Sequence, residues 1–207
     1  MEKFIDLTHT ITQSIATHNL DEPIKLEKIR TLSQDNYNDW RLCSGMHVGT
    51  HIDGPEHLTN SLTELSSVPI ESFIGKGCII DARNKAIIAL LLKNISLEKD
   101  SIVLILTNWD KKFGKPEYFA NHPIIQDDFA QILIKSKIKM LGIDFFSPDT
   151  YPFPVHKKLF AHNIFIAENL TNLEKLLDIP NFTIIALPFK VATDSAPARV
   201  IALTDFS

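Results

Sequence analysis

Five short apolar runs recur from residue 77 onward, each bounded by polar, glycine or proline residues. They are rich in Ile, Val and Phe, and their lengths suit buried strands better than helices. The runs are GCIIDAR (77–83), SIVLILT (101–107), KMLGIDFF (139–146), IFIAE (164–168) and FTIIALPF (182–189). The sequence therefore predicts a sheet of buried strands in this part of the molecule.

Helix-like patterns lie between the strand runs. They cover residues 84–95, 126–138, 154–163 and 171–179. Asn84 is a candidate N-cap for the first pattern, and Asp127 or Asp128 stands in the first turn of the second. The more polar segments 24–32 and 39–53 indicate solvent-edged strands or a hairpin. Strands that alternate with helices, after a β-rich first part, predict the α/β fold class.

Composition and charge restrict the class of protein. The chain has 207 residues, of which 44% are hydrophobic and 22% charged, and this suits one globular domain over residues 1–207. The net charge is -4 with no basic face, so a nucleic acid is not an expected partner. The apolar runs are too short to span a bilayer. Cys43 and Cys78 form no disulfide framework and the N-terminus lacks a signal-peptide pattern, which favours a cytoplasmic location.

The segment HVGTHIDGPEH concentrates side chains that bind metal ions. It holds His47, His51, Asp53 and His57. On a straight strand His47 and His51 would stand about 13 Å apart, at roughly 3.3 Å per residue, which is too far for one ion. A helix is disfavoured by the two glycines and the proline. We therefore expect a bent strand end or loop that curls these side chains around a centre.

Gly49 and Gly54 permit such a bend, because glycine adopts conformations that strain other residues. The motif alone leaves two interpretations open: a metal site, or histidines at surface and hydrogen-bonded positions. A second pair strengthens the metal interpretation. His156 stands at the start of a predicted helix, and Glu168 ends the strand run that follows.

With these residues the sequence resembles the cyclase family of metal-dependent hydrolases, whose best-known members are bacterial kynurenine formamidases. The family motif HxGTHxDxPxH corresponds to residues 47–57. A histidine followed twelve residues later by a glutamate in an ENL context corresponds to His156 and Glu168. Weaker matches are LTNW (106–109), GIDFFSPD (142–149) and APARVIAL (196–203). The resemblance therefore runs over most of the chain, in order.

The resemblance implies a fold and a set of roles. The fold is a single-domain swivelling β/β/α fold within the α/β class, assembled as a homodimer, a homotetramer or another oligomer. His57 corresponds to the catalytic acid/base residue, and Asp53 and Glu168 bridge the ions if two are bound. The implied metal ligands are His47, His51, Asp53, His156 and Glu168.

This donor set predicts hydrolytic chemistry. Three imidazoles and two carboxylates suit Zn²⁺ and also Mn²⁺, Co²⁺ or Fe²⁺, and we expect one or two Zn or Mn ions per chain. A bound ion lowers the pKa of its water to about 7, so that hydroxide can attack an amide carbonyl. His57 is the expected general acid/base. The predicted activity is cleavage of a non-peptide C–N bond in a small amide or lactam, with N-formylkynurenine as the type substrate.

A non-catalytic metal-binding protein, either a sensor or a scaffold on the same fold, is the alternative. Such a protein has no need of a free base beside its ions, so His57 favours the enzyme. A structural zinc module is disfavoured, since such sites are rich in cysteine and neither cysteine belongs to the cluster.

Four further side chains are weaker candidates. Asp144 either orients a ligand histidine through a hydrogen bond or caps a turn. Arg199 binds a substrate carboxylate or forms a structural ion pair. Trp109 walls the pocket or packs in the core, and His18 offers a hydrogen bond to substrate.

Two positions depart from the family pattern. Gly54 replaces the usual alanine, which is a tolerable change. Residues 9–23 contain no Phe, Trp or Tyr, whereas formamidases carry a substrate-contacting tryptophan there. Ring stacking contributes roughly 0.5–1.5 kcal/mol beyond area burial. We therefore expect weak catalysis on N-formylkynurenine and better turnover of a smaller or more polar amide or lactam.

Overall fold

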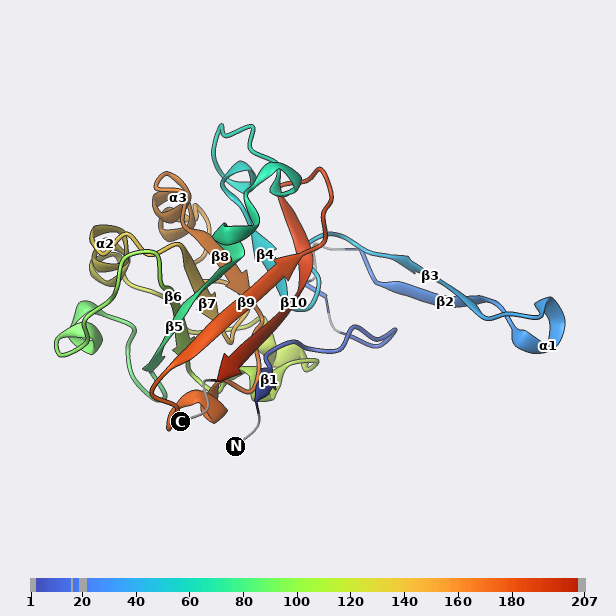
Figure 1. Ribbon diagram of the computed structural model, residues 1–207, viewed down its shortest axis with the longest axis horizontal. Coiled ribbons are helices and arrows are strands. Elements are labelled where there is room, and N and C mark those ends of the chain that lie inside the picture. Colours follow the sequence, from blue (N-terminus) through green and yellow to red (C-terminus); the bar gives the residue numbers. More distant parts are fainter. Residues whose placement is uncertain (1–2, 16, 19–21, 205–207) are drawn as a thin grey trace.

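A closed ring of seven strands forms the body of the protein (Figure 1). The computed structural model describes residues 3–15, 17–18 and 22–204. The strands follow the order β10-β4-β8-β7-β6-β5-β9, and β9 pairs back with β10, while β1 pairs with the C-terminal part of β10. These strands are β1 (Phe4–Asp6), β4 (His51–Asp53), β5 (Ile74–Asp81), β6 (Ile102–Leu106), β7 (Met140–Ile143), β8 (Phe165–Glu168), β9 (Phe182–Pro188) and β10 (Ser195–Thr204).

The ring closes through β10. Strands β5 to β8 run parallel, and the other neighbours in the ring are antiparallel. β10 pairs with β4 over residues 195–197 and with β9 over residues 198–204, so one long strand serves two partners. β4 consequently lies between β10 and β8, where it carries His51 and Asp53.

The parallel strands β6, β7 and β8 are buried on both faces, which explains their continuous apolar runs. Along β6, Ile102, Leu104 and Leu106 belong to one buried cluster, which also contains side chains of β9 and β10. Val103 and Ile105 point the other way, into a second cluster that contains side chains of α2 and α3. Alternation along a strand thus divides one apolar run between two cores.

The helices are short. The α-helices are α1 (Leu32–Asp35), α2 (Asp127–Lys135) and α3 (Pro154–Phe160). No helix in the described part of the chain is long and apolar enough to cross a membrane. The 3-10 segments are η1 (Pro55–His57), η2 (Leu65–Ser67), η3 (Ile70–Phe73), η4 (Ala89–Leu92), η5 (Trp109–Lys112), η6 (Pro116–Tyr118) and η7 (Leu173–Leu176).

The five predicted strands are confirmed as β5 to β9, and the predicted helices 126–138 and 154–163 are confirmed as α2 and α3. β1 and β10 were not predicted. The helix predicted over 171–179 is only the 3-10 segment η7. Its buried residues Leu173 and Leu176 are three apart, a spacing that one turn of 3-10 helix serves as well as an α-helix does.

The helix predicted over 84–95 is wrong, because tertiary packing overrides its local pattern. Asn84 adopts a left-handed conformation with φ 55° instead of capping a helix. Ile87 is buried and forms a β-bridge with Ile125. Ile88 is extended, and only Ala89–Leu92 form a 3-10 turn. An extended chain places Ile87 in the core, and a helix beginning at Asn84 is incompatible with that bridge.

The predicted hairpin in the first part of the chain is an arm that projects from the body (Figure 1). β2 (Lys25–Arg30) and β3 (Asp39–Cys43) form a separate two-stranded sheet, with α1 at its tip. Every residue of β3 is exposed, and so is all of β2 except Leu26. The arm exposes large apolar side chains, namely Ile29, Leu32, Tyr37, Trp40 and Leu42, and these residues define the apolar surface of the arm.

Candidate metal centre

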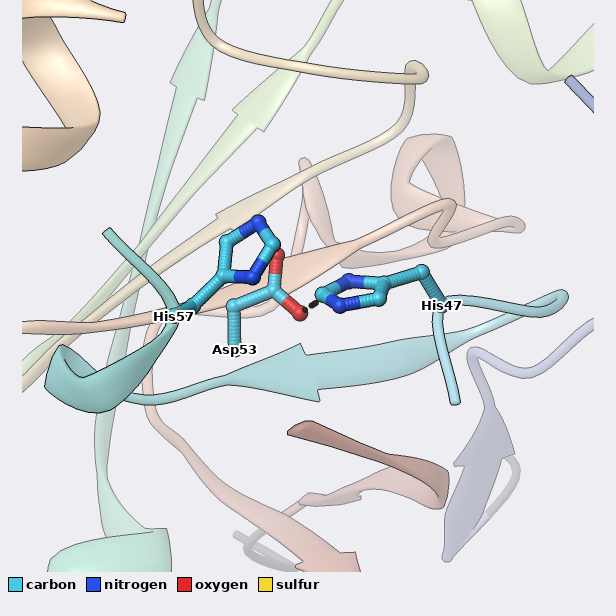
Figure 2. Close-up of side chains that lie close together, drawn as sticks. All are labelled: His47, Asp53 and His57. Atoms are coloured by element: carbon cyan, nitrogen blue, oxygen red, sulfur yellow. Dashed lines mark ion pairs between the residues drawn. The ribbon is translucent and has the colours of Figure 1, made fainter. Parts of the chain in front are cut away.

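The segment that enters β4 bends at Gly49, as the sequence indicated. Gly49 has φ 59°, a left-handed conformation that suits glycine. A Cβ at this position would lie 3.3 Å from Ile11 Cγ1, so the site also lacks room for a side chain. The bend returns His47 toward β4, and Figure 2 shows the rings of His47 and His57 beside the carboxylate of Asp53.

The five expected ligands converge. His51 on β4 is the register partner of Glu168 on β8. Asp53 Oδ1 lies 2.9 Å from His47 Nδ1 and 3.4 Å from His51 Nε2. Glu168 Oε2 lies 3.4 Å from His51 Nε2, and Glu168 Oε1 lies 3.3 Å from His156 Nε2. Four of the five residues are buried, and His47 is partly exposed.

These separations suit donors that share an ion. Two atoms bound to one ion at about 2.1 Å and at angles of about 90–110° lie roughly 3.0–3.4 Å apart. His51 Nε2, Asp53 Oδ1 and Glu168 Oε1 are buried and have no hydrogen-bond partner among the described residues. Asp53 Oδ1 belongs to these unpaired atoms because its 2.9 Å contact with His47 Nδ1 lacks the geometry of a hydrogen bond. Unpaired buried polar atoms are costly. The residues therefore fit a divalent cation, and their role as ligands stays a prediction.

Each histidine of this set is oriented through its other ring nitrogen. His51 Nδ1 lies 2.8 Å from the carbonyl oxygen of Gly49. His156 Nδ1 lies 2.5 Å from Asp149 Oδ1. His47 Nε2 lies 2.9 Å from the hydroxyl oxygen of Ser195. Such outer partners fix the tautomer of metal-binding histidines, so that the nitrogen facing the carboxylates carries the lone pair.

In the absence of an ion, the carboxylates favour protonated histidines. Burial lowers the pKa of His47, but the charge of Asp53 and the contacts with Asp194 and Asp53 together outweigh burial, and the pKa rises to about 9. Burial also lowers the pKa of His156, but contacts with Asp149 and Glu168 raise it to about 10. Cation binding therefore displaces protons from these rings.

His57 lies beside this cluster on a separate turn. It ends the 3-10 segment η1, and its ring centroid is 4.2 Å from that of His47. Its Nδ1 is 2.9 Å from Asp194 Oδ2. Ligand-type atoms of His47, Asp53 and His57 lie within 4.8 Å of one another, and so do those of His51, Asp53 and Glu168. The two groups share Asp53, and the geometry accommodates His57 either as a ligand or as a base.

Asp144 has the contacts of a turn cap. Asp144 directly follows β7. Its carboxylate accepts hydrogen bonds from the backbone N–H groups of Thr107 and Asn108 at 2.8 and 2.7 Å. The hydroxyl of Thr107 donates a third, at 2.5 Å. Burial raises the pKa of Asp144 to about 7 in spite of these donors. The carboxylate that contacts His156 Nδ1 is that of Asp149 instead.

Arg199 and Trp109 lie in structural contacts. The guanidinium of Arg199 donates to both carboxylate oxygens of Asp6, at 3.0 and 2.6 Å, on the exposed side of β10. The indole N–H of Trp109 donates to the carbonyl oxygen of Tyr118 at 2.8 Å, and the ring packs against the second core. These contacts favour the structural interpretation of both residues.

Four side chains that contact the candidate ligands or His57 were not singled out in the sequence: Asp149, Asn169, Asp194 and Ser195. Asp149 also accepts hydrogen bonds from the backbone N–H groups of Val155 and His156, so a carboxylate just before a predicted helix was its signal. Asn169 donates to the carbonyl oxygen of Gly49 at 2.9 Å and thereby holds the bend, which explains the asparagine after Glu168.

A narrow cavity beside His47 is lined by aromatic side chains. His18 stacks on Phe146 with ring centroids 5.0 Å apart, and Phe119 is edge-on to both rings. Loops after β6 and β7 supply these rings, which residues 9–23 lack, and this favours an aryl substrate over the smaller or more polar one expected from the sequence. The aromatic slot, as we call it, is lined by His18, Phe113, Phe119 and Phe146.

The chain is similar to known proteins over nearly all its length. The profile of the Cyclase family, described as "Putative cyclase", matches residues 5–150. Kynurenine formamidase of Bacillus mycoides (strain KBAB4) is 30% identical over 208 residues, which is 96% of this chain and 96% of that protein. This similarity extends past the residues that the family profile matches.

Two solved structures share the fold. Isatin hydrolase A from Ralstonia solanacearum superposes with a TM-score of 0.87 at 23% identity, over 98% of this chain and 92% of that chain. Isatin hydrolase A from Labrenzia aggregata bound to benzyl benzoate gives a TM-score of 0.86 at 21% identity, over 98% and 94%. They confirm the expected α/β class and β/β/α fold. The profile match and the identity to the Bacillus protein together show that this chain belongs to the cyclase family.

Proposed function

We propose that the protein is a metal-dependent hydrolase that cleaves a non-peptide C–N bond in a small aryl amide or lactam. The observation that carries this proposal is the convergence of five nitrogen and oxygen donors, three of them with buried unpartnered atoms, beside a further histidine. The named activities of the relatives, kynurenine formamidase and isatin hydrolase, agree with this chemistry.

The residues that hold the cation are His47, His51, Asp53, His156 and Glu168. When bound, a cation of the Zn or Mn type supplies an activated water at neutral pH and polarises the scissile carbonyl. The donor set lacks thiolate and suits either metal. Asp53 faces His47 and His51, and Glu168 faces His51 and His156, so two carboxylates that each face two histidines support one or two ions per chain.

His57 moves the proton in this proposal. Its Nδ1 is occupied by Asp194, so Nε2 is the nitrogen left for catalysis. The ring is partly exposed and therefore accessible to water and substrate. His57 takes a proton from the attacking water and delivers it to the leaving nitrogen, as a positioned general acid/base does.

The aromatic slot determines the substrate class in this proposal. It adjoins His47 and Gly49, so a ring held there places an attached amide next to the candidate ligands. The open space is only about 10 Å³, so a flat substrate ring would replace the His18 ring that now stacks on Phe146, where stacked and edge-on contacts are available. Arylformamides such as N-formylkynurenine and lactams such as isatin have this shape.

We expect kcat/KM to be higher for N-formylkynurenine than for N-formyl derivatives of aliphatic amines. Stacking of roughly 0.5–1.5 kcal/mol corresponds to about twofold to tenfold in rate. Phe146→Leu should lower kcat/KM for the aryl substrate by a similar factor and leave the aliphatic substrates unchanged. Steady-state kinetics on both proteins measure this.

Equal loss on both substrate types in Phe146→Leu would contradict the slot. A protein that retains its metal but turns over no amide or lactam of the panel would instead favour the sensor or scaffold alternative.

We also propose that a second copy of the chain covers the arm, giving a homodimer or homotetramer. β2 and β3 pair only with each other among the described strands, and a lone two-stranded hairpin is marginally stable in water. The apolar surface of the arm is unusual on an isolated molecule. The body carries an apolar groove with exposed Ile70 and Phe189, which matches the arm in character. A two-fold axis would let each arm reach the partner's groove.

Light scattering after size exclusion tests this assembly. We expect an oligomeric mass for the wild type and a shift toward monomer for Trp40→Ser, because serine removes the largest apolar side chain of the arm. Lys25→Ser, an exposed polar change on β2, is the matched control and should keep the wild-type mass. A monomeric wild type would contradict this assembly.

We propose that residues 1–207 form one domain and that the protein is located in the cytoplasm. The first and last described strands, β1 and β10, pair with each other, so both ends of the described chain belong to one sheet. Cys43 and Cys78 are both free thiols, which agrees with a reducing compartment. Limited proteolysis and cell fractionation test these two statements.

A further inference from the structure

Asp194 contacts His57 from the loop that precedes β10. Its Oδ2 lies 2.9 Å from His57 Nδ1. The same oxygen is 3.6 Å from His47 Nε2, and that nitrogen has a nearer partner, the hydroxyl of Ser195 at 2.9 Å. Ser195 is therefore the nearer partner of His47, and Asp194 lies nearer to His57 while it also forms a longer ion pair with His47.

The backbone holds Asp194 and His57 in a fixed relation. The N–H of Gly54 donates to the carbonyl oxygen of Asp194 at 2.9 Å. The N–H of His57 donates in turn to the carbonyl oxygen of Gly54 at 3.1 Å. Asp53, which precedes Gly54, lies on β4, and Ser195, which follows Asp194, lies on β10; these two residues are register partners. The contact between the carboxylate and the imidazole is thus built on paired strands.

Gly54 is the residue that permits this close approach. A Cβ at this position would lie 3.0 Å from the carbonyl oxygen of Asp194, tighter than ordinary contacts. The conformation of Gly54, with φ -105° and ψ 171°, is open to any residue, so the reason for glycine is space. The departure from the usual alanine therefore lets the Asp194 loop lie against the turn that carries His57.

We propose that Asp194 is the positioning residue for His57. The inference rests on the proposed function, in which His57 is the acid/base group. As acceptor of the Nδ1 proton, the carboxylate fixes the tautomer in which Nε2 carries a lone pair. Nε2 then takes the proton of the attacking water and later gives it to the leaving nitrogen, so the ring returns to its starting tautomer. The carboxylate stays ionised and stabilises the imidazolium between these two steps.

Asp194→Asn tests this role, since it keeps the shape and removes the charge. We expect kcat to fall roughly 10- to 100-fold, part of the 10²- to 10⁴-fold that acid–base catalysis supplies. KM and bound metal should stay near wild-type values. In a His57→Ala background the same change should have no further effect on kcat, because the carboxylate then has no imidazole to orient.

A second readout does not depend on turnover. Nitrogen-15 spectra of the zinc-loaded protein report the tautomer of each histidine, and the His57 signals are assigned by their loss in His57→Ala. We expect the Nδ1–H tautomer in the wild type and a mixture in Asp194→Asn. Asp100→Asn is the matched control, because Asp100 is exposed and its φ of 60° suits asparagine. It should leave both kcat and the spectra unchanged.

Three outcomes of the kinetic and metal measurements would overturn the role of Asp194. They are an unchanged kcat in Asp194→Asn, a loss of metal that accounts for the lost activity, and an equal fold-loss with and without His57. A wild-type tautomer in Asp194→Asn would do so as well. If the wild type hydrolyses none of the amides or lactams, the proposed function fails, and the spectra still decide whether Asp194 orients His57.

Discussion

Glu168→Ala is expected to lose its bound metal and to lower turnover by about a thousandfold or more. Glu168 faces both His51 and His156, so its removal takes away the carboxylate that joins them. Metal ions contribute several kcal/mol to the transition state, and each 1.4 kcal/mol is about tenfold in rate. His156→Ala should have the same result. Elemental analysis and kcat on the same preparations measure it.

The controls separate metal loss from misfolding. His162→Ala changes an exposed histidine just beyond α3 and should keep both metal and activity. Chelation should lower the melting temperature of the wild type, since a ligand at a hundredfold excess over Kd stabilises by about 2.7 kcal/mol. Chelation should have little effect on the melting temperature of Glu168→Ala. Full metal content in both Glu168→Ala and His156→Ala would contradict the prediction of a five-ligand site.

His57→Ala is expected to retain its metal and to lose activity by about 10²-fold or more, the scale for a positioned acid/base. The five other side chains still supply the donors, and His57 already directs one ring nitrogen to Asp194. The comparison of kcat with metal content decides between catalyst and ligand. KM should change little, because the aromatic slot does not include His57.

His57 could instead be a metal ligand, since ligand-type atoms of His47, Asp53 and His57 lie close together. Loss of metal in His57→Ala, with normal turnover per remaining metal, would make His57 a ligand. A variant with wild-type kcat would give it a packing role. His162→Ala again serves as the control for removal of an imidazole.

The sequence predicted those elements whose pattern is local. The strands β5 to β9 and the helices α2 and α3 follow from apolar runs and their spacing, because period and length distinguish strand from helix within one segment. The bend at Gly49 followed from conflicting demands within one short segment. The helix predicted over 84–95 failed for the complementary reason, since the bridge between Ile87 and Ile125 is set by the rest of the fold.

The exposure of the arm also could not be predicted from the sequence. Its strands were predicted, but a hairpin that leaves its apolar side chains exposed is visible only in three dimensions. The aromatic slot is similar, because its rings come from three separate segments around residues 18, 113–119 and 146. No periodicity relates such positions, and only the packing of loops brings them together.

The sequence by itself determined the type of chemistry of the candidate site: it showed which side chains of the segment 47–57 are able to bind a cation, and the family resemblance predicted that His156 and Glu168 complete the set. Ligand type and short spacing are local properties, and a resemblance to a family can carry them. The tertiary structure decided which atoms face one another. The pairing of β4 with β8 sets Glu168 opposite His51, and the pairing of β4 with β10 sets Asp194 beside His57. Such contacts join residues more than a hundred positions apart, and they depend on the strand register that the whole buried core stabilises.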